Sequence, residues 1–338
     1  MNSSKAIDHK SDNFKYSFIC CVEAGRLEYQ TCLMISTFRK NAGESLKNSP
    51  LYVVSGRSGS RLSNQTIEFF LKKNVQYVKA HKNNPKPWFN YSNKVAAVSW
   101  AQENLKSEYI VWLDSDILIA GDFIKDLSGD FDFAGRCETH APVVAYGEEK
   151  YISYWKRICD LAHCSFDQIP WINIENIDSK LKLYFNSGFF IWKRSSVFAE
   201  KYREIFVNLL NSRYATSDGV AWFADQVIIS PIVIANRLKW RHISLRNHHM
   251  VFSGHIDGQD PSPDMENSNL IHYSKSLTGD CKSRMMARLK VELPEIHDHV
   301  LNFEKDFNMP NGLLNKFNLI SILRRFRQMI FMKTVMKV

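Results

Sequence analysis

Stretches predicted as strands alternate with helical stretches through the first third of the chain, and this alternation constrains the fold more than any other feature. The predicted strands are 16–22, 51–54, 75–78 and 109–113. The predicted helices cover 27–38, a segment that begins near Ser63, and 92–105. Such an alternation predicts an α/β domain whose mostly parallel sheet carries helices on both faces.

The second part of the chain is less regular. Residues 130–183 have weaker periodicity, and we interpret them as an insertion or lid. Residues 184–192 are strand-like, and 196–210 and 218–235 have helical patterns. Residues 243–264 are rich in His, Gly, Asp and Pro, which indicates loops. We therefore predict a disordered tail over 1–15, one domain over 16–300, and a C-terminal helix within 311–338.

Positive charge is concentrated at the C-terminus. Of the formal charge of +9, six positive charges lie within 313–338, where no acid occurs, so the rest of the chain carries only +3. This distribution argues against a nucleic-acid-binding protein. The first 15 residues lack the apolar segment of a signal peptide, and no apolar run is long enough for a spanning helix. We expect a cytoplasmic chain whose seven scattered cysteines are reduced.

Two aspartates follow an apolar run in the sequence Tyr-Ile-Val-Trp-Leu-Asp-Ser-Asp-Ile-Leu-Ile, residues 109–119. In an extended strand, Asp114 and Asp116 would point to one face, with Ser115 on the other. Carboxylates between apolar runs are costly unless a positive charge neutralises them. Mg²⁺ or Mn²⁺ would suit the pair and bridge it to a diphosphate, whereas a solvated turn without a ligand is the alternative.

Further motifs occur in a fixed order around this pair. They are Cys21-Val22-Glu23, Tyr91-Ser92-Asn93-Lys94, Asp114-Ser115-Asp116, Phe185-Asn186-Ser187-Gly188, Asp225-Gln226 and His272-Tyr273. With this set, residues 16–275 resemble the metal-dependent GT-A fold glycosyltransferases, particularly the glycogenin and bacterial galactosyltransferase-like group. The resemblance implies a Rossmann-like fold that moves a hexose from a nucleotide-diphosphate sugar, with UDP as the nucleotide, to a glycan or lipid-linked acceptor.

The resemblance also implies roles for the two halves of the domain. The half 16–120 would bind the nucleotide, and the half 121–300 would hold the acceptor and complete the metal site. Asp116 would bind Mn²⁺ or Mg²⁺ directly, Asp114 would share the metal or hold the donor ribose, and His272 would complete the site. The donor-binding set implied is Cys21, Val22, Glu23, Asn93, Lys94, Asp114, Ser115, Gly188 and Lys275.

Three residues are implied near the transferred sugar. Asn186 would hydrogen-bond sugar hydroxyls beside Gly188, which allows close approach of the backbone. Asp225 would bind hydroxyls of the donor sugar, and Gln226 would stabilise positive charge at the anomeric carbon or orient the acceptor. Lys94 begins a predicted helix, where a cation has a use against the charge of a leaving diphosphate.

One departure from the glycogenin pattern affects the stereochemistry. Those enzymes follow the late histidine with a glycine and a Lys-Pro-Trp motif that holds the diphosphate. Here Lys275 comes three residues after His272, and no Lys-Pro-Trp occurs. We interpret the reaction as retaining, by front-face displacement, and an inverting outcome stays open.

The C-terminal helix has a basic and an apolar character. Its apolar residues fall on one helical face and are Leu319, Ile322, Leu323, Phe326 and Ile330. Basic residues surround them without any acid, a pattern typical of a helix that lies on an anionic membrane. Peripheral attachment to the inner face of a membrane through 313–338 and packing against the domain both remain open.

Two other functions compete with glycosyl transfer. A sugar-1-phosphate nucleotidyltransferase also uses acidic metal ligands, but it carries a Gly-rich loop with Arg and Lys after the first strand. That position here reads Glu-Ala-Gly-Arg-Leu-Glu, which suits a triphosphate poorly. A catalytically inactive binding or scaffold protein is the other alternative, and the intact set of motifs argues against it.

Overall fold

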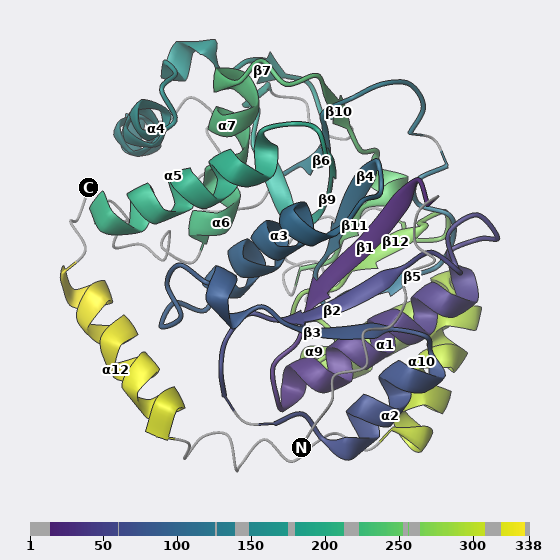
Figure 1. Ribbon diagram of the computed structural model, residues 1–338. Coiled ribbons are helices and arrows are strands. Elements are labelled where there is room, and N and C mark those ends of the chain that lie inside the picture. Colours follow the sequence, from purple (N-terminus) through teal and green to yellow (C-terminus); the bar gives the residue numbers. More distant parts are fainter. Residues whose placement is uncertain are drawn as a thin grey trace.

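Seven strands form the central sheet of the computed structural model (Figure 1). In spatial order they are β10 (Trp240–His242), β6 (Phe133–Cys137), β9 (Phe185–Lys193), β4 (Tyr109–Leu113), β1 (Tyr16–Cys21), β2 (Leu51–Ser55) and β3 (Gln76–Lys79). Six strands are parallel, and β9 runs antiparallel between β4 and β6. The predicted mostly parallel sheet is confirmed.

The structure describes residues 14–59, 61–125, 127–138, 149–174, 180–212, 223–252, 256, 264–307 and 319–334. The predicted tail over 1–15 lies almost wholly outside these residues. A second sheet of three short strands joins β11 (His249–Met250), β12 (Leu270–His272) and β5 (Ile117–Ile119), and a two-stranded sheet joins β7 (Trp171–Ile172) to β8 (Leu181–Lys182).

Helices cover both faces of the central sheet, as predicted (Figure 1). One face packs against α1 (Arg26–Asn41), α2 (Asn64–Lys72), α9 (Cys281–Glu292) and α10 (Pro294–Asp306). The other packs against α3 (Ser92–Asn104), α4 (Glu149–Leu161), α5 (Phe198–Ser212), α6 (Ala224–Val227) and α7 (Ile229–Ala235). The predicted domain end at residue 300 falls inside α10.

Alternating side chains of the strands supply the two cores. Phe18 and Val111 belong to the core beside α1, whereas their neighbours Ile19 and Trp112 belong to the core beside α3. Burial on both faces explains why these strands read as continuous apolar runs. Each fully buried large apolar side chain contributes about 1.5–3 kcal/mol relative to an exposed one.

Local hydrogen bonds fix where the helices begin. Ser63 caps α2, because its hydroxyl accepts a hydrogen bond from Thr66 N–H at 3.2 Å. Glu28 in the first turn of α1 accepts from Gly25 N–H at 2.8 Å and from Ser63 N–H at 2.7 Å. One carboxylate thereby fixes the loop after β1 relative to the start of α2.

Two expectations for the second part of the chain need correction. Residues 130–183 are not wholly an insertion, because β6 is an inner strand of the central sheet. Both faces of β6 are buried, so its sequence shows no alternation. The helix expected over 218–235 is divided at Ile228 into α6 and α7, and residues 213–222 lie outside the described part. Pro231 has no N–H to continue α6 and fits the first turn of α7.

Candidate active site

The aspartate pair lies in the turn that joins β4 to β5. Asp114 N–H donates to Gly188 O at 2.7 Å, and Tyr273 N–H donates to Asp116 O at 3.0 Å. The expected extended strand through the pair is therefore wrong, because β4 ends at Leu113 and the backbone turns there. The turn still directs both carboxylates to one place at the carboxyl end of the sheet.

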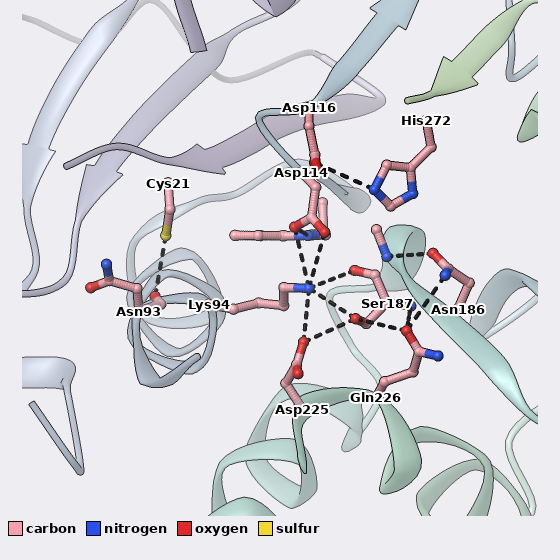
Figure 2. Close-up of polar contacts among 12 residues, drawn as sticks. Cys21, Asn93, Lys94, Asp114, Asp116, Asn186, Ser187, Asp225, Gln226 and His272 are labelled. Carbon is pink, nitrogen blue, oxygen red and sulfur yellow. Dashed lines mark hydrogen bonds and ion pairs between the residues drawn. The ribbon is translucent and has the colours of Figure 1, made fainter. Parts of the chain in front are cut away.

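Strand pairing brings a histidine to this turn. Strand β12 runs antiparallel to β5 and places His272 opposite Ile117, the residue after Asp116. His272 Nε2 lies 3.3 Å from Asp116 Oδ1 (Figure 2). Asp114, Asp116 and His272 each offer one ligand atom, and the three atoms lie within 4.8 Å of one another. The predicted metal-binding residues are thus together, although His272 is far from the pair in the sequence.

The charges of these groups depend on one another. Burial lowers the pKa of His272, but Asp116 outweighs burial and the pKa is raised overall. Burial raises the pKa of Asp116, but His272 reverses this and holds the pKa below its usual value. Burial raises the pKa of Asp114, and Lys94 beside it does not fully compensate. Two carboxylates and an imidazole therefore gather at one place, a ligand set that suits a divalent cation.

Lys94 connects the turn to two other elements (Figure 2). It lies in the first turn of α3, and its side chain is 7% exposed. Its Nζ donates to Ser187 O at 2.9 Å and lies 3.2 Å from Asp114 Oδ1 and 2.9 Å from Asp225 Oδ2. Burial lowers the pKa of Lys94, but Asp114 and Asp225 more than reverse this and raise it. A charged lysine therefore joins α3, the aspartate turn, β9 and α6.

The Asn-Ser-Gly sequence lies at the start of β9, next to His272. Asn186 Nδ2 donates to Glu138 Oε2 at 2.7 Å, and Gly188 N–H donates to Asn186 Oδ1 at 2.7 Å. A Cβ atom on Gly188 would lie 2.3 Å from His272 Cε1. This contact is too short for any side chain, so glycine is required for His272 to keep its position.

Asp225 and Gln226 of α6 both hydrogen-bond to Ser187 of β9 (Figure 2). Ser187 Oγ donates to Asp225 Oδ2 at 2.9 Å, and Ser187 N–H donates to Gln226 Oε1 at 3.0 Å. Tyr202 hydroxyl donates to Asp225 O at 2.8 Å. The structure therefore brings Asp225, Gln226 and Asn186 together around one serine.

The carboxyl end of β1 brings together further residues of the predicted donor-binding set. Cys21 Sγ donates to Asn93 O at 3.3 Å, and Val22 N–H donates to Val54 O at 3.1 Å. The Glu23 carboxylate accepts hydrogen bonds from the guanidinium of Arg57 and from Asn93 Nδ2. Glu23 and Asn93, which the sequence places in the donor-binding set, are thus direct partners.

Sequence reasoning missed four residues of the site: Trp112, Glu138, Ser187 and His248. His248 Nε2 lies 3.4 Å from His272 Nδ1, and the two rings stack with their planes 17° apart. Burial, with a further contribution from His272, holds the pKa of His248 well below its usual value. A neutral His248 therefore orients the His272 ring from behind. Trp112 Nε1 donates to Asp114 Oδ1 at 2.8 Å. Trp112, two residues before Asp114, and Ser187, between Asn186 and Gly188, had a local signal in the sequence.

A cleft of about 670 Å³ opens above the turn. Eight residues of the predicted set line it: Cys21, Glu23, Asn93, Lys94, Asp114, Ser115, Asp116 and Lys275. Six others do not line it within the described part of the chain, namely Val22, Asn186, Gly188, Asp225, Gln226 and His272. These six are buried and lie next to the lining residues. Arg26 and Arg57 also line the cleft.

A family model matches residues 18–237 and is described as the Rhodobacterales glycosyltransferase domain. The chain belongs to this glycosyltransferase family. The match covers Lys94, the aspartate pair, Asn186 and Gln226, and it ends before His272. Together with the sheet described above, the match confirms the predicted recognition of a GT-A glycosyltransferase on an α/β fold.

A comparison with solved structures finds glycosyltransferases that are similar to this chain at low sequence identity. The bifunctional glycosyltransferase WbbM is 12% identical with a TM-score of 0.49, over 87% of this chain and 53% of its own. The galactosyltransferase LgtC is 11% identical with a TM-score of 0.45, over 82% and 96%. Mouse xyloside xylosyltransferase 1 is 13% identical with a TM-score of 0.47, over 78% and 99%. The chain therefore spans about half the length of WbbM.

A search among curated proteins gives no match to this glycosyltransferase. Within its described residues, no helix combines the length and the apolar character needed to cross a membrane. The seven cysteines are free in the structure.

Proposed function

We propose that this glycosyltransferase moves a hexose from a UDP-sugar to a glycan or lipid-linked acceptor, with Mn²⁺ or Mg²⁺ at Asp114, Asp116 and His272. One observation carries the proposal: ligand atoms of these three residues lie within 4.8 Å of one another, and both aspartates line the cleft. Two carboxylates and a neutral imidazole are a suitable ligand set for such a cation. When bound, the cation supplies positive charge to the leaving diphosphate.

Lys94 has two uses in this proposal. It holds Asp114 and Asp225 at fixed positions through its ion pairs. It also lines the cleft as a charged group, so its potential favours the negative charge that develops on the diphosphate. Because the lysine is already ordered by Ser187, little reorganisation is needed when the donor binds.

The residues beside Lys94 suit the donor sugar. We infer that Asn186 and Asp225 bind sugar hydroxyls and that Gln226 faces the anomeric carbon, while Gly188 beside them leaves room for the His272 ring. Their support is the hydrogen-bond network around Ser187, which keeps all three polar side chains next to the aspartate turn. The Asp225 carboxylate of this network is held by Lys94 and Ser187, so we infer that retention would proceed by front-face displacement and not through a covalent intermediate.

The nucleoside belongs at the other end of the cleft. We infer that Cys21, Val22, Glu23 and Asn93 form its wall, because they meet at the carboxyl end of β1. Ser115 and Lys275 line the cleft between this wall and the metal-binding residues, where the diphosphate would lie.

The acceptor is inferred from the C-terminal helix. Helix α12 (Leu319–Thr334) exposes seven large apolar side chains, which are Leu319, Ile320, Ile322, Leu323, Phe326, Met329 and Ile330. It also exposes Arg327 and Lys333 outside the cleft and contains no acid. Apolar and basic groups on one helix suit an anionic membrane surface, where a lipid-linked acceptor would be found.

Calorimetric titration of UDP and of GDP, with and without Mn²⁺, tests the proposal. We expect UDP to bind wild-type protein in a Mn²⁺-dependent manner, and we expect Asp116→Asn to remove that dependence. Asp130→Asn is a matched control, because Asp130 is exposed and pairs only with surface lysines. UDP-sugar hydrolysis by wild type but not by Asp116→Asn would then identify the donor.

Other results of the nucleotide titration would change the proposal in different ways. Binding of GDP alone would retain the transferase and change the donor. Binding of UDP without any effect of Mn²⁺ or of Asp116→Asn would contradict the metal site. If neither nucleotide binds in the presence of metal, the inactive scaffold replaces the enzyme, and turnover of a nucleoside triphosphate with a sugar phosphate would favour the nucleotidyltransferase.

A further inference from the structure

Helix α12, yellow in Figure 1, turns a polar face toward the cleft and exposes apolar side chains to solvent. Ser321, Arg324, Arg325 and Gln328 occur at helical spacing and line the cleft. The apolar side chains Leu323, Phe326 and Ile330 lie on the other side and are between 45% and 58% exposed. A terminal helix that packed only for stability would turn its apolar face inward, so the polar face has another use.

The helix is held against the cleft at two points. Phe331 packs against Trp88, with 4.9 Å between their ring centroids, and Arg327 lies over the same indole at 5.6 Å. Arg324 Nη2 donates to the backbone carbonyl and the hydroxyl of Ser58. The loop after β2 and the segment before α3 thus both contact α12, which places its polar face over the nucleotide half of the cleft.

Positive charge gathers on this wall without matching negative charge. Arg57 already forms an ion pair with the Glu23 carboxylate. Arg324 lies close enough to Arg57 for the two guanidinium groups to repel each other. Arg325 has no hydrogen-bond or ion-pair partner among the residues that the structure describes. Guanidinium groups that face one cleft from two elements form a site for an anion.

We propose that Arg324 and Arg325 bind the phosphates of the nucleotide donor, so that α12 is a wall of the donor site. This inference rests on the proposed function and adds two residues to it that the family match does not reach, since that match ends at residue 237. A guanidinium binds phosphate oxygens through two parallel N–H groups, so the contribution should depend on how many phosphates the ligand carries.

The test measures the affinities of uridine, UMP and UDP in the presence of Mn²⁺. For Arg325→Gln we expect the UDP affinity to fall by about tenfold, the usual size of one charge-assisted hydrogen bond. The double variant with Arg324→Gln should lose more, whereas uridine should bind all proteins equally. Lys333→Gln is the matched control, because Lys333 is an exposed cation of the same helix that does not line the cleft.

Thermal unfolding of each variant separates lost contacts from lost folding. If Arg324→Gln releases the helix from Ser58, Arg325→Gln still tests the proposal, since Arg325 makes no hydrogen bond or ion pair with the residues that the structure describes. Equal UDP affinities of wild type and both variants would overturn the inference while leaving the proposed function intact. An equal loss for uridine, or an equal loss in Lys333→Gln, would also overturn it. Failure of the wild type itself to bind UDP would instead count against the proposed function.

Discussion

Lys94 shows how one residue can hold a site together. Its ammonium group contacts Asp114, Asp225 and Ser187, which come from three different elements. Removal of one partner from a buried ion pair leaves an uncompensated buried charge. The free energy of unfolding then falls by more than the intact pair contributes to it. The same residue therefore links the chemistry of the cleft to the stability of the fold.

Replacement of this lysine should be strongly destabilising. For Lys94→Met we expect the free energy of unfolding to fall by about 3–5 kcal/mol, because two carboxylates lose their counter-charge. Urea denaturation measures the change. Lys94→Met combined with Asp225→Asn should recover part of the loss, since one orphaned charge is then removed. A loss in the double variant equal to the sum of the two single losses would show that the pair does not interact.

Gly188 is the second residue with a testable constraint. A methyl group at this position would meet the His272 ring at 2.3 Å, so Gly188→Ala must displace the ring. Overpacking of this kind costs about 1–3 kcal/mol. We expect Mn²⁺ affinity to fall about 10–100-fold, as for other changes that reorient a metal ligand. Titration of the folded variant with Mn²⁺ measures this, and unchanged affinity would show that His272 is not a ligand.

Whether a site residue could be predicted from the sequence depends on how far apart its contacts lie along the chain. The aspartate pair could be found because an apolar strand precedes it within the same segment. Glu138 and His248 could not, since their site contacts join residues 48 and 24 positions apart and no local pattern marks either one. The roles assigned to the donor-binding and catalytic residues stay predictions.

At the scale of elements, short strands in the small sheet matter as much as the central sheet. Strand β12 has three residues, yet its antiparallel register with β5 alone brings His272 to the aspartate turn. A shift of one residue would turn His272 to the opposite face. The sequence indicated β1, β2, β4 and β9 because each contains a run of apolar residues. In β6 such a run is interrupted by Gly135 and Arg136.

Helix α12 gives a prediction that belongs to the element as a whole. We expect the protein to sediment with vesicles containing phosphatidylglycerol and much less with neutral phosphatidylcholine vesicles. Leu323→Ser with Phe326→Ser should weaken this binding by at least tenfold, because each buried large apolar side chain contributes about 1.5–3 kcal/mol. Added salt should also weaken it, since each basic group near the surface contributes about 1 kcal/mol.

The chain offers a matched control for that experiment. Leu71 on α2 is 74% exposed, so Leu71→Ser removes a comparable apolar side chain from another surface. This variant should bind vesicles as wild type does. Equal binding of the Leu323→Ser, Phe326→Ser variant and wild type would show that the exposed face of α12 does not contact lipid.

The alternation of strands and helices predicts the first half of the molecule better than the second half. The predicted sheet and its two helical layers are present because β1, β2 and β4 bury both faces. The position of α12 was left open by its sequence, since a basic amphipathic pattern fits a membrane and a protein surface equally. Only the tertiary fold decides which face turns inward, and here it is the polar one.

The contacts of Lys94 also set an order of events during synthesis. The ribosome delivers α3 and β4 early, whereas Ser187 is 93 positions after Lys94, and Asp225 and His272 follow later still. Until those residues emerge, the lysine and the aspartates lack the partners that permit their burial. A nascent chain therefore cannot assemble the cluster around Lys94 and the aspartate pair until residue 272 has emerged and folded.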